Sequence, residues 1–354
     1  MKKGIACILA ALLLSGCTGG RPVPDAAGAP DAPNGQAVQT IVMDAAEDAT
    51  PVPTAIPAPT PTAAPAYAPL TRGTENADTA ALTARLCALG YLPKELAGEA
   101  LDERALHGCA LFAAAAGIAG ETADTASAAL QARLFAADAP ACTLALAGYI
   151  IGLDPGHQAH GNSAPEPVAP GASETKKKVS SGTSGIDTRV PEYQVNLAVG
   201  LLLRDLLAAE GAIVVMTHTE ADVDISNSER AVLFNTAKTD YALRLHCNGS
   251  NNHDKRGAFM LIPKKNPFSD DCRRAAELLI DAYCSETGLK NLGITVRSDQ
   301  TGFNWCERMI VNIEMGHMTN AAEDRLLTDA AFQQKMAKGL CAGIVAYFAQ
   351  KTAG

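Results

Sequence analysis

From residue 149 onward, short apolar runs alternate with longer segments in which apolar residues recur every three or four positions. The short runs have the length of buried strands, and the longer segments have the period of helices that bury one face. Parallel strands need a crossover connection, and a helix usually supplies it. The alternation therefore predicts an α/β domain over residues 149–350, with a twisted, largely parallel sheet covered by helices.

The individual elements can be placed by their periodicity and their end signals. Predicted strands include residues 149–153, 213–216, 241–245, 257–262 and 308–313. Predicted helices include an apolar stripe over 195–207 that ends at Gly211, residues 225–237, residues 268–287 capped by Gly288, and one or more closing helices over 321–348.

Reactive side chains stand at or just past the ends of three predicted strands. His157 follows the first, His246 the second and Glu314 the third, while Glu192 opens a predicted helix. The carboxyl ends of the strands are where an open α/β sheet binds ligands. Two imidazoles and a carboxylate suit a zinc ion that keeps one position open for water. A second carboxylate, not bound to the metal, could remove a proton from that water.

The first residues predict export. Lys2 and Lys3 precede an apolar stretch, residues 5–14, that is too short to span a bilayer and fits a secretory signal. It ends in Leu-Ser-Gly-Cys at positions 14–17, which resembles the bacterial lipobox, where the cysteine is acylated. We expect residues 1–17 to be a lipoprotein signal and Cys17 to anchor the mature chain to the membrane; an ordinary signal peptide with an incidental cysteine is the alternative.

Two segments separate this signal from the α/β domain. Residues 18–75 are rich in Pro, Ala and Thr, have few large apolar groups, and are expected to form a disordered linker. Residues 76–145 predict three short helices, the first two ending at Gly90 and Gly117. Through residues 86–92 and 112–117 this segment resembles a small peptidoglycan-binding repeat; a helical spacer without a ligand fits equally.

Charge and cysteine content limit the possible partners and bonds. The net charge of −9 argues against nucleic acid as a partner, and a monomer is expected. Of ten cysteines, Cys7 and Cys17 belong to the signal. The remainder would permit disulfides in an exported protein, but their irregular spacing also suits small buried apolar residues.

Residues 149–349 resemble the zinc-dependent N-acetylmuramoyl-L-alanine amidases of the Amidase_3 type, which cut the bacterial cell wall. The matching segments are residues 153–157, 192–197, 228–231, 245–249 and 311–320. The resemblance implies zinc as the cofactor, His157, Glu192 and His246 as its ligands, and Glu314 as the catalytic residue. It also implies peptidoglycan as the substrate, cut between the lactyl group and L-alanine.

Other residues near the predicted site are weaker candidates. Asn248 and His317 are substrate-binding candidates, and the side chain of Cys247 should point away from that of its neighbour His246. The loop over 158–190 is longer than in compact relatives. Its glutamates, Glu166 and Glu174, are expected to be solvated, and its three lysines at 176–178 should form an exposed face that could touch acidic groups of the wall.

Two other functions stay open at this point. One is a zinc peptidase that acts within the stem peptide, and the other is a non-catalytic scaffold that binds the wall. Loss of a ligand or of Glu314 would have favoured the scaffold, but all four residues are present.

Overall fold

The computed structural model describes residues 67–120 and 122–353. The predicted signal, Cys17 and most of the predicted linker lie outside the described residues. The described residues form two hydrophobic cores, one within residues 70–134 and one that begins at residue 146, and we call the segments around them the small domain and the α/β domain. Among the described residues, no helix has the length and apolarity needed to cross a membrane.

The small domain contains the three helices that the sequence predicts. Leu82 and Leu86 of the first helix pack with Phe112 and Leu130 of the other two in its core. The second helix ends at Gly117, which takes the left-handed conformation with φ 69°. The elements are β1 (Leu70–Thr71), α1 (Ala77–Ala88), η1 (Lys94–Leu96), α2 (Glu103–Ala116), β2 (Thr125–Ala126) and α3 (Ala128–Leu134).

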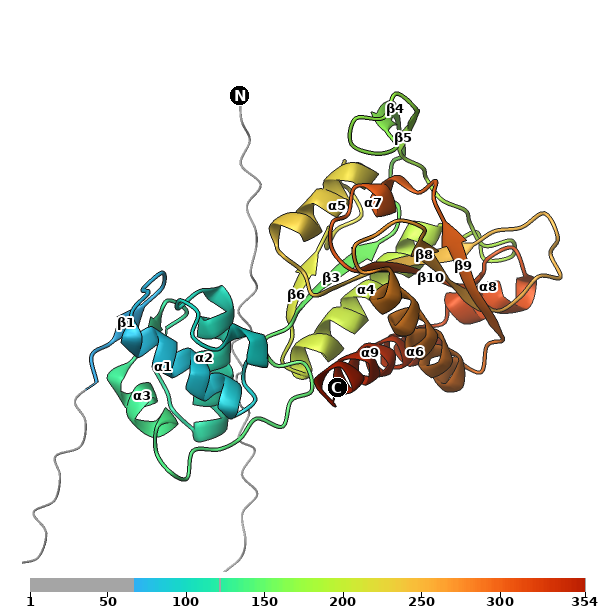
Figure 1. Ribbon diagram of the computed structural model, residues 1–354. Helices are drawn as coiled ribbons and strands as arrows, with labels where there is room; N and C mark the ends of the chain where they lie inside the picture. Colours follow the sequence, from blue (N-terminus) through green and yellow to red (C-terminus); the bar gives the residue numbers. More distant parts are fainter. Residues whose placement is uncertain (1–66, 121, 354) are drawn as a thin grey trace, which may run out of the picture. The chain divides into compact units, whose positions relative to one another are not determined.

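The α/β domain is built on a six-stranded sheet in the order β6-β3-β7-β10-β8-β9 (Figure 1). Neighbouring strands are parallel except for β10 and β8, which pair antiparallel. The predicted α/β class with a largely parallel sheet is therefore confirmed. The strands are β3 (Ile150–Pro155), β6 (Ile213–Met216), β7 (Tyr241–Asn248), β8 (Ala258–Pro263), β9 (Asn291–Arg297) and β10 (Ile310–His317).

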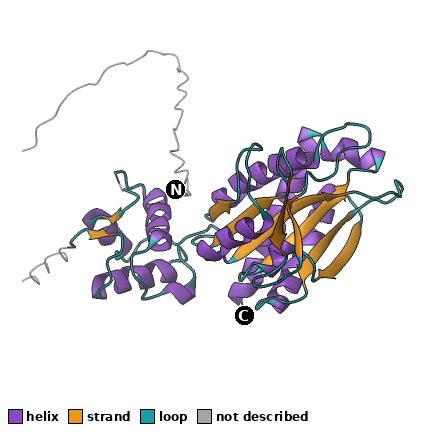
Figure 2. Ribbon diagram, turned by 90° about the horizontal axis from the view of Figure 1, so that it is seen from above, coloured by secondary structure: helices purple, strands orange, loops and turns teal. Residues whose placement is uncertain are grey.

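Helices cover both faces of this sheet (Figure 2). One face packs against α4 (Glu192–Ala209), α6 (Ser269–Thr287) and α9 (Ala330–Ala353), and the other packs against α5 (Asn227–Thr236) and α7 (Thr301–Asn304). The short helix α8 (Ala321–Leu327) follows β10, and the segment between β3 and α4 contains a hairpin of β4 (Asn162–Pro167) and β5 (Thr175–Val179). A capping box between Ser226 and Glu229 starts α5, as the sequence indicates.

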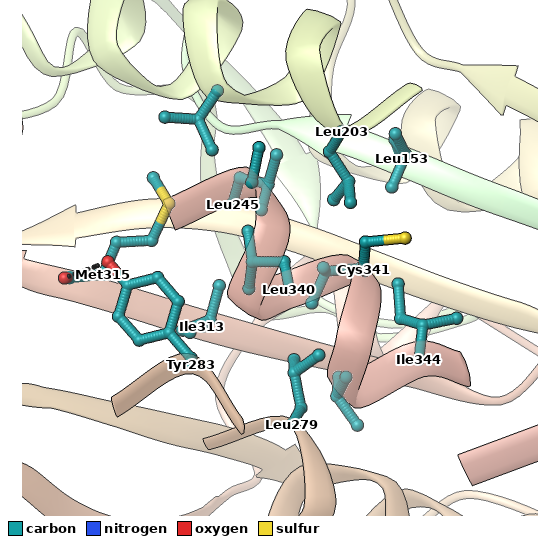
Figure 3. Packing of buried hydrophobic residues seen from close by; sticks show 14 of the residues in the cluster. Leu153, Leu203, Leu245, Leu279, Tyr283, Ile313, Met315, Leu340, Cys341 and Ile344 are labelled. Carbon is teal, nitrogen blue, oxygen red and sulfur yellow. Dashed lines mark hydrogen bonds between the residues drawn. The ribbon is translucent and has the colours of Figure 1, made fainter. Parts of the chain in front are cut away.

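Side chains that alternate along the strands point in turn to the main core and to the opposite, more polar face of the sheet. Leu245 of β7 packs in the main core with Leu203 of α4 and Ile344 of α9 (Figure 3). Because side chains alternate across a strand, Arg244 and His246 point to the opposite face, which α5 and α7 only partly cover. The core side of β7 therefore leaves His246 on the face of the sheet where two cavities open.

Two strands run further than the sequence predicts. The strands β7 and β10 continue to Asn248 and His317, so His246 and Glu314 lie within strands rather than after them. The register between β7 and β10 shifts after Glu314. The eight cysteines beyond the signal are thiols, and six of them are buried, which fits their interpretation as small apolar residues.

Candidate metal centre

Three side chains predicted as ligands meet at the carboxyl edge of the sheet. Nε2 of His157, Oε1 of Glu192 and Nδ1 of His246 form a triangle in which all three edges measure 3.2 Å. Tetrahedral zinc with bonds of about 2.0–2.1 Å separates its ligand atoms by roughly 3.3 Å. The three atoms therefore have the spacing of one face of such a tetrahedron, which leaves the fourth position to a water or a substrate.

His157 lies two residues past β3 in an unusual backbone conformation. Its φ is +68°, in the left-handed region that non-glycine residues rarely adopt. Its carbonyl oxygen accepts a hydrogen bond from Nη2 of Arg230 at 3.0 Å. Its ring Nδ1 lies 2.8 Å from the carbonyl oxygen of Ser180, to which it donates as an N–H. This bond fixes the tautomer that presents the Nε2 lone pair to a metal.

Glu192 is the first residue of α4 and is buried. Its Oε1 accepts hydrogen bonds from the backbone N–H of Cys247 and from Nδ2 of Asn196, and its Oε2 accepts one from the backbone N–H of Thr183. Burial acts to raise the pKa of this carboxyl, but the bonded rings of His157 and His246 hold it below the usual value. The positive end of the helix dipole also favours the charged form. Glu192 is therefore a carboxylate, the form that binds a metal.

His246 is held in place by the backbone of Gly156. A Cβ added to Gly156 would lie 2.1 Å from Cε1 of the His246 ring, so only glycine fits there. Nε2 of the ring is buried without a polar partner, which leaves Nδ1 as the atom that faces the other two ligands. Burial lowers the pKa of His246 to about 4, so the ring is neutral, as a metal ligand must be.

A buried charge network supports the strand that precedes His157. Asp154 accepts hydrogen bonds from Arg230 at 2.7 Å and from Arg244 at 2.8 Å. Burial opposes ionisation of Asp154, but the two guanidinium groups hold its pKa well below the usual range. Arg230 also donates to the carbonyl oxygen of Pro155, and so it ties α5 to the end of β3. Sequence reasoning missed Arg244, although a charged residue inside the apolar run 241–245 indicates a buried ion pair.

Glu314 lies beside the triangle but is not part of it. In the parallel pair of β7 and β10, Glu314 is directly in register with His246. Burial, and then the charge of Glu192, raise the pKa of Glu314 to about 8, while Nδ2 of Asn312 donates to its Oε1 at 3.2 Å. A cation bound by the three predicted ligands would lower the pKa of Glu314, because nearby positive charge favours the carboxylate. The protonation of Glu314 therefore depends on the charge held by the three neighbouring side chains.

Two cavities of about 410 and 620 Å³ adjoin the centre, and both are lined by Ser180, His246 and Glu314. The smaller one is otherwise lined mainly by charged and polar groups, including Lys176, Lys177, Asn227, Arg244, Arg297, Asp299 and Gln300. The larger one includes His157, Glu192, Thr183, Asn248, Ser250, Asn251, His253 and Thr319. An extended substrate could therefore place its scissile bond at the triangle and one part of its chain in each cavity.

The weaker candidates divide into exposed and supporting residues. Asn248 lines the larger cavity, whereas His317 is buried behind it, with its Nε2 3.0 Å from Nδ2 of Asn248. Cys247 packs in the main core and points away from the centre, as predicted. Glu174 is exposed, but the expectation that Glu166 is solvated is wrong. Glu166 is buried because its Oε2 accepts hydrogen bonds from the backbone N–H and the hydroxyl of Ser228.

Comparisons with known proteins point to one family. A family model described as N-acetylmuramoyl-L-alanine amidase matches residues 151–346. An N-acetylmuramoyl-L-alanine amidase of Mycobacterium tuberculosis is 26% identical over 214 residues, which cover 58% of this chain and 88% of that protein. The germination-specific N-acetylmuramoyl-L-alanine amidase of Bacillus subtilis is 25% identical over 228 residues, covering 59% of this chain and 84% of that protein. Among solved structures, the N-acetylmuramyl-L-alanine amidase Ami1 from Mycobacterium smegmatis is similar with a TM-score of 0.53 and 25% identity, covering 57% of this chain and 98% of that one.

Proposed function

This chain belongs to the Amidase_3 family of N-acetylmuramoyl-L-alanine amidases and is an enzyme of that type, and we propose that it acts with a zinc ion bound by His157, Glu192 and His246. The substrate is peptidoglycan, and the bond is the amide between the lactyl group of N-acetylmuramic acid and L-alanine. The observation that carries the zinc proposal is the triangle of three ligand atoms with edges of 3.2 Å.

The residues of the centre each have a separate part in the proposed reaction. Zinc, when bound, would supply Lewis acidity toward a water molecule and toward the amide carbonyl. His157, through its bond to Ser180, and His246, through its contact with Gly156, keep two ligand atoms in fixed positions. Glu192 contributes negative charge that is already stabilised by backbone N–H groups.

Glu314 is proposed as the general base and then the general acid. Its carboxylate takes a proton from the attacking water while the water oxygen bonds to the carbonyl carbon. When the C–N bond breaks, the same carboxyl delivers that proton to the nitrogen of the leaving L-alanine, because an amine leaves poorly without a proton. Support comes from its register beside His246 and from its place on the wall of both cavities.

Asn248 and His317 are proposed to act together on the substrate side of the centre. Asn248 presents its amide to the larger cavity. His317 lies behind it, and its Nδ1 is 3.0 Å from the carbonyl oxygen of Gly257, which leaves Nε2 to accept from Asn248. We therefore propose Asn248 as a substrate contact and His317 as the residue that positions it.

The rest of the chain is proposed to deliver this enzyme to the wall. Acylation of Cys17 would hold the chain at the membrane, and the Pro-rich linker would let the enzyme reach a polymer that cannot diffuse to it. The small helical domain would serve as a wall-binding module or as a spacer. The family model matches residues 151–346 and does not extend to these parts of the chain, so their proposed roles rest on the sequence.

The alternative function, hydrolysis of a bond within the stem peptide, is distinguished by the products. A defined muramoyl peptide is incubated with the purified chain, with the chain after removal of metal by a chelator, and with that chain after addition of zinc. The proposal expects free muramic-acid lactyl carboxylate and a peptide with an N-terminal L-alanine, in the first and third samples only. Products cut inside the peptide would establish the alternative, and equal turnover in all three samples would refute the metal requirement.

A further inference from the structure

The smaller cavity beside the metal centre differs in charge from the larger one. Three cationic side chains of the hairpin and of β9 line it, namely Lys176, Lys177 and Arg297. Apart from Glu314 at the catalytic end, its only carboxylate is that of Asp299. We propose that this cavity is a subsite for the carboxylates of the stem peptide, with Lys177 and Arg297 as the residues that recognise them. This inference rests on the proposed function, because it concerns the substrate of that same centre.

The hairpin that carries the lysines is fixed against the domain. Trp305 donates through Nε1 to the carbonyl oxygen of Pro167 at 2.9 Å, and Nδ2 of Asn304 donates to the carbonyl oxygen of Val168 at 3.1 Å. The buried carboxylate of Glu166 is bonded to Ser228 at the start of α5. Contacts with α5 and α7 therefore hold the backbone of the hairpin that carries the lysines, which lowers the ordering cost of binding at this cavity.

The ion pairs of the cavity leave positive charge available to a ligand. Nε and Nη2 of Arg297 each donate to Asp299 at 2.8 Å, and Nζ of Lys176 contacts the same carboxylate. The single carboxylate of Asp299 is therefore shared between Arg297 and Lys176. Lys177 has no carboxylate partner among the residues that the structure describes, and it is exposed on the cavity wall. A carboxylate that enters this cavity meets an unpaired ammonium group.

Beyond the metal centre, the larger cavity offers mainly uncharged polar groups, and this difference indicates which part of the substrate each cavity binds. Thr183, Asn248, Ser250 and Asn251 offer hydroxyl and amide groups there, which suit the hydroxyl and acetamido groups of a neutral sugar. On the two sides of a muramoyl–L-alanine bond, only the peptide carries free carboxylates. The charge difference therefore places the stem peptide toward the hairpin and the glycan toward residues 248–251.

The test compares two muramoyl tripeptides that differ in one group. In one the D-glutamate has a free α-carboxylate, and in the other this group is an amide. The variant Lys177→Gln removes the unpaired charge, Lys177→Arg restores it, and Lys178→Gln is the matched control. Lys178 is the next residue of β5 and is not among the residues that line the cavity.

The proposal expects the unaltered chain to show a KM for the acidic substrate that is roughly threefold to tenfold below that for the amide, the effect of one partly exposed charge pair. Lys177→Gln should lose this preference with kcat unchanged, whereas Lys177→Arg and Lys178→Gln should keep it. Equal KM values for the two substrates in the unaltered chain, or a preference that persists in Lys177→Gln, would overturn the subsite.

Binding separates this inference from the proposed function. The free peptide L-Ala-D-Glu-L-Lys and its α-amide are titrated calorimetrically into the full chain and into each variant. Binding that favours the acid and depends on Lys177 supports the subsite even if the chain cleaves neither muramoyl peptide. Cleavage of both substrates without Lys177-dependent binding refutes the subsite and leaves the proposed function intact.

Discussion

Replacing Gly156 with alanine should weaken the metal centre without removing any ligand. The new Cβ would lie 2.1 Å from Cε1 and 2.5 Å from Nδ1 of His246, whereas ordinary contact begins at 3.4 Å. The ring would have to retreat by about 1.3 Å, the difference between the shorter distance and ordinary contact. Metal sites tolerate deviations of only about 0.2 Å. We expect the affinity for zinc to fall by roughly 10- to 100-fold, the range for loss of a residue that orients a ligand.

Competition with a chromogenic chelator measures this affinity, and Gly152→Ala provides the control. Gly152 lies in β3, which ends one residue before Gly156, but its added Cβ would meet the ring of Phe234 at 2.6 Å. That variant should lose about 1–3 kcal/mol of stability through overpacking while keeping its affinity for zinc. If Gly156→Ala binds zinc as tightly as the unaltered chain, His246 is not held against Gly156 as a ligand and the reasoning is wrong.

Three further changes test other parts of the account. Glu314→Gln should keep bound zinc but lower kcat by roughly 100-fold or more, measured by release of N-terminal alanine; near-normal turnover would exclude Glu314 as the base. Asp154→Asn leaves Arg230 and Arg244 without their buried counter-charge and should cost about 3–5 kcal/mol in urea unfolding. Because pairing lowers the pKa of Asp154, its stabilisation is present above about pH 4 and is lost as the pH falls further, so the variant should show a weaker acid dependence. Cys17→Ser should release the chain from membranes or block its processing, and mass spectrometry of the mature N-terminus would detect an acylated Cys17 or contradict the anchor.

The positions of the ligands could be predicted because they depend on local patterns. His157 and His246 follow or end apolar runs, and parallel strands in one sheet end at the same edge. Glu192 stands at the start of an amphipathic helix whose apolar stripe fixes its orientation on the sheet. Each of these inferences needs only the residues near the predicted ligand, and the structure brings the three predicted ligands together.

The hairpin and its charges could not be predicted in the same way. The strand β4 contains two prolines, Pro165 and Pro167, which cannot donate to a ladder, and it has no alternation of apolar and polar residues. Glu166 is buried because of Ser228, a residue 62 positions away. Likewise β9 is a mostly exposed edge strand interrupted by Gly293, so burial leaves little pattern in its sequence. Such contacts arise only from the assembled fold.

Anomalous diffraction at the zinc absorption edge, from crystals of the chain prepared with one equivalent of zinc, tests the central claim most directly. The account predicts a single peak that lies about 2.0–2.1 Å from Nε2 of His157, Oε1 of Glu192 and Nδ1 of His246. A peak that involves other residues, or the absence of any peak at this triangle in crystals of a chain that cleaves muramoyl peptides, would contradict it.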